Sequence, residues 1–115
     1  MQPSTIAIFV VAGLHVGFFI LESLLWTSPT VMRIFNTTKE EAHTTRVLAL
    51  NQGFYNLGAA ALLIWLHSTS NTAGVMGLLL FLVGMGLVGA ITANWRIILL
   101  QSLPAMAAFL ILCTD

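Results

Sequence analysis

Apolar residues fill four long segments of the chain, and polar residues collect in the short connections between them. By hydropathy the segments cover residues 6–26, 45–66, 73–93 and 97–113. Each is close to the roughly 20 residues that a helix needs to cross a bilayer, and none alternates as a barrel strand does. We therefore expect an all-α polytopic membrane protein, with residues 1–115 forming a single domain, a four-transmembrane-helix bundle.

Composition supports this class and excludes several others. Charged residues make up only 7% of the chain and hydrophobic residues 58%, whereas soluble domains carry roughly 25% charged residues. A net charge of zero without Lys/Arg clusters argues against a nucleic-acid surface. A single cysteine, Cys113, excludes an internal disulfide framework. We expect the lipid bilayer as partner, with no nucleic acid, no metal and no cofactor.

The positions of the four cations predict an orientation in the cell membrane. Arg33, Lys39 and Arg46 lie between or beside the first two segments, and Arg96 lies between the last two. Because Lys and Arg favour cytoplasmic loops, both basic connections are expected inside and both termini outside. A tryptophan falls at the end of three segments, where indoles favour the headgroup region: Trp26, Trp65 and Trp95.

The first connection contains helix boundary motifs. Pro29 is expected to end the first helix. Residues 37–41 offer two overlapping capping boxes, Thr37 with Glu40 or Thr38 with Glu41. We expect a helix that begins near Lys39 and runs unbroken into the second segment.

A cluster of polar residues interrupts the second segment at Leu50-Asn51-Gln52-Gly53-Phe54-Tyr55-Asn56. On a helical wheel its four polar side chains fall within an arc of about 140°. This predicts a polar face with an apolar back. The four side chains are Asn51, Gln52, Tyr55 and Asn56.

The first segment carries a matching stripe, whose members are spaced four, three and four residues apart and project within about 60° of one another: His15, Phe19, Glu22 and Trp26. Glu22 is the only carboxyl inside any segment. A charged group costs roughly 2.5–3.5 kcal/mol or more at the centre of a membrane helix unless it is protonated, paired or hydrated. We therefore expect Glu22 to face inward and to mark a functional site.

Counting depth along an antiparallel hairpin arranges these residues in two polar layers, with Gln101 added from the fourth segment. Polar groups in hydrocarbon need internal partners, so the layers predict a buried polar compartment. One layer holds His15, Tyr55 and Asn56, and the other holds Glu22, Asn51, Gln52 and Gln101.

The last two segments contain features that shape helix packing. Gly86 with Ala90, and Gly89 with Ala93, are small-residue pairs that allow close approach of helices within the bundle or between protomers. Pro104 removes a hydrogen bond to the carbonyl of Leu100 and predicts a kink one turn beyond Gln101.

Three parts of the chain together resemble a widespread bacterial family of small four-helix membrane proteins catalogued as a domain of unknown function. They are His15 with Glu22, Leu25-Trp26 and Pro29; the run Ala49-Leu50-Asn51-Gln52-Gly53-Phe54-Tyr55-Asn56; and Gln101-Ser102-Leu103-Pro104-Ala105. The resemblance implies a four-span fold and no established activity.

Three functions therefore stay open. The first is binding or transport of a small polar solute, ion or proton, with the residues of the two layers as ligand-binding or proton-linked groups. The second is a membrane-embedded enzyme, an isomerase or hydrolase acting on a lipid-like substrate. The third is a structural or assembly role, in which the polar network only sets helix register. Because four helices enclose a narrow interior, we also expect a homodimer.

Overall fold

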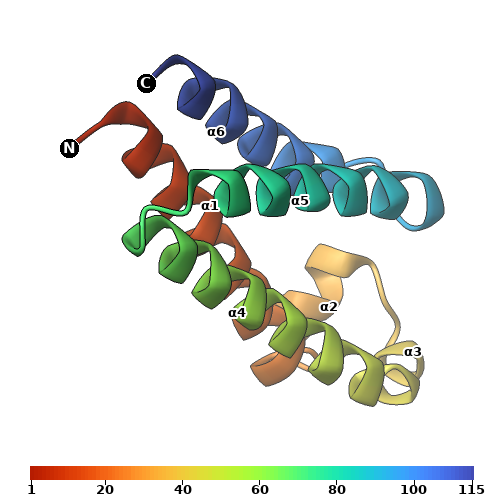
Figure 1. The fold of residues 1–115 in the computed structure, drawn as a ribbon. Coiled ribbons are helices and arrows are strands. Elements are labelled where there is room, and N and C mark those ends of the chain that lie inside the picture. Colours follow the sequence, from red (N-terminus) through yellow and green to blue (C-terminus); the bar gives the residue numbers. More distant parts are fainter. The chain divides into compact units, whose positions relative to one another are not determined.

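The computed structural model describes all 115 residues, and its secondary structure is entirely helical (Figure 1). The all-α class expected from the sequence is confirmed. In chain order the helices are α1 (Pro3–Phe19), the π-helical η1 (Ile20–Leu24), α2 (Pro29–Phe35), α3 (Lys39–Thr44), α4 (Arg46–Ser68), α5 (Thr72–Thr92), the π-helical η2 (Ile98–Ser102) and α6 (Leu103–Thr114).

Three helical segments are long and apolar enough to cross a membrane. They are Pro3–Leu24, Arg46–Ser68 and Thr72–Thr92, with 22, 23 and 21 residues. At 1.5 Å per residue each spans roughly 32–35 Å, which matches a hydrocarbon core about 30 Å thick. A fourth apolar helix, Ile98–Thr114, is shorter. These lengths indicate an integral multi-pass membrane protein, whereas a complete four-span bundle in one domain stays a prediction.

The helices pack as two compact units. Unit 1 contains residues 1–14 and 60–115, and unit 2 contains residues 15–59. In unit 1, α5 packs against η2 and α6. A Cβ at Gly86 would collide with Ser102 Oγ and lie 3.0 Å from the Ser102 nitrogen, and one at Gly89 would lie 3.2 Å from Ile97 Cγ2. The prediction of close packing within the chain is therefore confirmed for these two glycines.

In η2 the hydrogen-bond ladder changes just before a proline. The Leu103 N–H bonds to the carbonyl of Ile98, five residues back. Pro104, in the first turn of α6, has no N–H to give the carbonyl of Leu100. The residues before this proline form a π-helical turn, and Ser102 Oγ in that turn donates to Val83 O at 2.9 Å. The kink predicted at Pro104 stays a prediction.

In unit 2 the connection between the long helices is itself helical. The first helix ends at Leu24, and Pro29 stands in the first turn of α2, where its missing N–H costs no hydrogen bond. Ser28 caps that turn by accepting the Val31 N–H at 3.3 Å. α2 ends at Phe35, and its C-cap residue, Asn36, has a left-handed backbone with a φ of 55°.

Of the two possible capping boxes, the structure forms the one between Thr38 and Glu41. Thr38 Oγ1 accepts the Glu41 N–H at 3.0 Å, and Glu41 Oε1 accepts the Thr38 N–H at 2.9 Å. This box begins α3 at Lys39, where the sequence predicted a helix to begin.

The prediction that this helix runs unbroken into the membrane is wrong. α3 ends at Thr44 and α4 begins at Arg46, with Thr45 at φ −95° and ψ 4° between them. The hydroxyls of Thr44 and Thr45 donate to the carbonyls of Glu40 and Glu41 at 2.9 and 2.7 Å. Such back-bonds compete with the helix ladder and bend helices, and here two occur in succession.

Candidate functional site

The shortest side-chain hydrogen bond between the helical segments of unit 2 joins Glu22 to Asn56. Asn56 Nδ2 in α4 donates to Glu22 Oε1 in η1 at 2.6 Å. Asn56 is buried and Glu22 is half-buried. Both residues belong to the set predicted from the sequence, and the structure places them in direct contact.

The π-helical turn positions Glu22. The Leu25 N–H bonds to Ile20 O, five residues back, at 3.1 Å. One extra residue in a turn rotates the side chains that follow it and leaves backbone groups less regularly paired. Single π-turns inside α-helices occur often at functional sites.

Further contacts near the pair hold the end of α1 and η1 against α4. Ser23 Oγ donates to Leu50 O at 2.8 Å, and a Cβ at Gly53 would collide with that hydroxyl. The rings of Phe19 and Phe54 meet edge-to-face with centroids 5.1 Å apart. Gly53 therefore lets the two helices approach closely enough for Glu22 to reach Asn56.

A further hydrogen bond joins the residues just after η1 to the residue just before α4. Trp26 Nε1 donates to Thr45 Oγ1 at 3.1 Å, so the threonine at the break before α4 both bends the chain and receives the indole. The Trp26 ring also lies 5.0 Å from the ring of Phe35 in α2. The sequence placed Trp26 at a headgroup position and on the same helix stripe as Glu22, but it did not predict the bond to Thr45, which lies 19 residues away.

The other predicted site residues of unit 2 differ from one another in burial. His15 is buried and packs edge-to-face on Phe18, with centroids 5.2 Å apart. Asn51, Gln52 and Tyr55 are exposed on α4, and Tyr55 retains 76% of its accessible surface. Their assignment to a polar compartment stays a prediction.

The predicted grouping into two layers differs from the observed pairing. The sequence placed Glu22 with Asn51 and Gln52, and Asn56 with His15, but the structure pairs Glu22 with Asn56. Counting backbone depth leaves out the length of the glutamate side chain, which extends along the helix by up to about one turn. Gln101 lies half-buried in η2 of unit 1, and its role also stays a prediction.

Unit 1 has a second polar group that sequence reasoning missed. Thr5 Oγ1 and His67 Nε2 lie 3.1 Å apart, and the Phe9 ring meets the His67 ring edge-to-face at 6.3 Å. The Ser4 N–H donates to Asp115 Oδ2 at 3.0 Å. No local pattern marks these contacts, because they join residues 62 and 111 positions apart.

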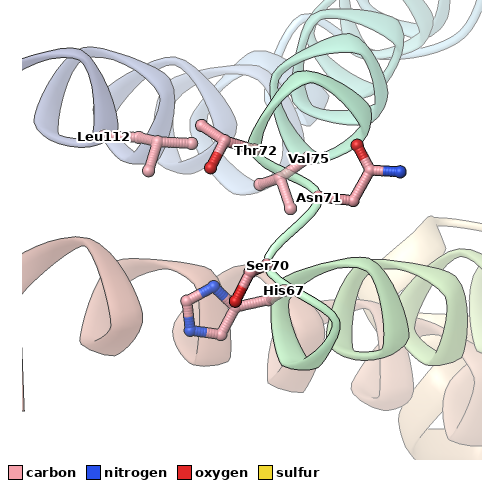
Figure 2. Close-up of a pocket in the computed structure, with 6 residues that line it drawn as sticks. All are labelled: His67, Ser70, Asn71, Thr72, Val75 and Leu112. Carbon is pink, nitrogen blue, oxygen red and sulfur yellow. The ribbon is translucent and has the colours of Figure 1, made fainter.

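A small hollow beside His67 is lined by the end of α4, the connection after it, α5 and α6 (Figure 2). Its volume of about 20 Å³ has room for about one water molecule. The lining residues are His67, Ser70, Asn71, Thr72, Val75 and Leu112. A space of this size does not fit an organic ligand.

The chain is similar to a known protein family and to a bacterial relative. A family model described as "Protein of unknown function (DUF1304)" matches residues 9–113. The chain is 34% identical over 94 residues to the uncharacterized protein YpaA of Lactococcus lactis subsp. lactis (strain IL1403), an alignment that covers 78% of this chain and 79% of that protein. No solved structure matches the chain significantly. The family match spans Glu22 and Asn56 together with the other residues singled out above, apart from those at the chain ends.

Proposed function

The chain belongs to the family of proteins of unknown function whose model it matches, as its sequence pattern predicted, and from that premise we propose a function based on the Glu22–Asn56 pair. The protein is a four-span membrane protein that binds or transports a small polar solute, ion or proton. Glu22 is the group that takes up the proton or cation, and Asn56 positions it.

The hydrogen bond of 2.6 Å between Asn56 Nδ2 and Glu22 Oε1 carries this proposal. A carboxyl within a membrane-length helix is costly and usually serves a function. Asn56 engages Oε1, and a carboxylate has acceptor sites on both oxygens. Oε2 is therefore left to take a proton or to bind a cation.

A second candidate, a structural role, has its own support. Ser23 to Leu50 and Trp26 to Thr45 are polar contacts between the same segments on either side of the pair. In this alternative, Glu22 and Asn56 form one more bond that sets helix register. No observation favours the third alternative, a membrane-embedded enzyme.

Proton flux into liposomes separates the two candidates. The full chain is reconstituted into vesicles that contain a pH-sensitive dye, and a potassium diffusion potential drives protons inward. Glu22→Gln keeps an oxygen that can accept from Asn56 but cannot ionise. We expect the wild-type flux to fall at least tenfold, to the protein-free level, while the melting temperature in detergent stays within a few degrees.

Glu40→Gln is the matched control, because it makes the same change on the exposed surface of α3. It should leave both the flux and the melting temperature unchanged. The same vesicles are tested with Na⁺ and K⁺ gradients in place of the proton gradient. If the wild type carries none of these ions, or if Glu22→Gln lowers only the melting temperature, the structural role replaces the proposed one.

A further inference from the structure

The part of α4 that belongs to unit 2 has an exposed face with polar side chains, which is unusual for a helix of membrane length. Leu48, Asn51, Tyr55 and Gly58 are spaced by three, four and three residues, so they project within an arc of about 80°. All four are exposed, and Leu48 and Tyr55 retain 70% and 76% of their accessible surface. We call these four residues the α4 seam.

The spacing of the α4 seam is that of a helix pairing surface. Residues that repeat every three and four positions line the contact of a left-handed pair of helices. In the sequence the same spacing continues to Leu62 and Trp65, which are also exposed. A polar Asn at one such position fixes register and the number of helices in soluble helix pairs.

The chemistry of Asn51 indicates what covers the seam. Lipid tails offer neither donors nor acceptors, so an amide on a membrane helix needs a polar partner. An Asn amide carries both a donor and an acceptor and is therefore complementary to a second copy of itself. Identical residues meet in this way across a two-fold axis.

Gly58 is a second feature of the α4 seam that favours close contact with another helix. A Cβ built at Gly58 would meet nothing within 4 Å, whereas one at Gly53 in the same helix would collide with Ser23. Gly53 is thus explained by packing within the chain, and Gly58 is not. A glycine on an exposed helix face lets another helix backbone approach closely.

We propose that the α4 seam is the site where a second copy of this chain docks, with α4 parallel to its counterpart about a two-fold axis normal to the membrane. Two chains inserted in the same orientation are related by such an axis, so each seam residue meets its own copy at the same depth. Asn51 pairs with Asn51 of the second copy, and Gly58 sets the closest approach. The inference does not rest on the proposed function, because Asn56 points about 140° away from Asn51 on the helix wheel.

Cysteine cross-linking in liposomes tests the face directly. The full chain carries Cys113→Ser and either Leu48→Cys or Leu50→Cys, and a copper oxidant forms disulfides. The two leucines lie about 3 Å apart in depth but about 160° apart around the helix, and both are exposed. We expect Leu48→Cys to form dimers at least tenfold faster than Leu50→Cys, and equal rates would overturn the proposal.

Substitutions test the contact without any cross-link. Because a Cβ at Gly58 would meet nothing within 4 Å, Gly58→Leu should fold normally and shift the monomer–dimer equilibrium in liposomes at least tenfold toward monomer. Gly77→Leu is the matched control, since Gly77 also has nothing within 4 Å. Asn51→Leu should weaken the dimer by about 3- to 30-fold, the range typical of one polar contact between membrane helices.

Energy transfer between labelled chains in liposomes measures this equilibrium, and melting temperature in detergent checks folding. A wild-type chain that stays monomeric, with lipid alone against the seam, would refute the proposal. So would a dimer that Gly77→Leu disrupts and Gly58→Leu does not.

Discussion

Gly53 has no side chain, and this lets η1 lie directly against α4. Gly53→Ala would push a methyl group into Ser23 Oγ and to within 3.0 Å of the Ser23 backbone nitrogen. Because backbone cannot move aside without breaking the neighbouring contacts, we expect the free energy of unfolding to fall by about 1–3 kcal/mol. Unfolding in mixed micelles at low protein concentration measures the change.

Gly84→Ala provides the comparison for Gly53, because a Cβ at Gly84 meets nothing within 4 Å. Because alanine has less backbone conformational freedom than glycine in the unfolded chain, Gly84→Ala should raise the free energy of unfolding by about 0.5–1 kcal/mol. Equal effects at the two glycines would contradict the packing role assigned to Gly53.

At the residue scale, sequence reasoning identified the polar groups but not all of their partners. Glu22 and Asn56 stood out because polar side chains are rare in apolar segments. That these two meet depends on the π-turn at η1 and on the length of the glutamate side chain. No residue pattern in the first segment predicted that π-turn.

At the scale of elements, the capping box of α3 makes a pH-dependent contribution to the helix start. The N–H of Thr38, and secondly its side chain, hold the pKa of the Glu41 carboxyl below its ordinary value. A group whose pKa is lower in the folded state stabilises that state above its unfolded pKa, and this contribution is lost as pH falls through the folded pKa. We therefore expect the protection of the Thr38 amide against hydrogen exchange, measured relative to its intrinsic rate at the same pH, to fall below about pH 4.

Hydrogen exchange followed by NMR in micelles measures this effect. Glu41→Gln removes the charge but keeps an oxygen that can accept from Thr38, so protection should be lower and no longer change with pH in this range. Glu40→Gln leaves the box intact and should reproduce the wild-type profile. A wild-type profile without any change in this range would show that the box is not charge-dependent.

The elements also show where local reasoning succeeds and fails. The Thr38–Glu41 motif predicted the start of α3, because a capping box involves only residues three positions apart. The break at Thr45 was not predicted, since threonine is common inside membrane helices and only the pair of hydroxyl back-bonds interrupts this one.

At the scale of the whole molecule, contacts within unit 1 bring both chain ends together. Ser4 bonds to Asp115, and Thr5 lies against His67 at the end of α4. The N-terminus, the connection after α4 and the C-terminus therefore lie at the same end of unit 1 (Figure 1). These are the three parts that carry no Lys or Arg and that the charge distribution predicts outside.

Labelling of single cysteines in intact cells tests that orientation. In a Cys113→Ser chain, Ser68→Cys at the end of α4 should react with an impermeant thiol reagent, and Glu40→Cys in α3 should react only after the membrane is opened. Both positions are exposed, and neither belongs to a helix cap. The opposite labelling pattern would reverse the predicted topology.

Hydropathy and capping are properties of neighbouring residues, so the sequence alone was enough to predict the class, the apolar helices and a helix start near Lys39. It also selected Glu22 and Asn56 as unusual for a membrane segment. The packing of the helices was needed to show that these two residues bond to each other, that Gly53 makes room for this contact, and that Asn51 and Tyr55 are exposed. Those outcomes depend on the rotation and depth of one helix against another, which a single sequence constrains only weakly.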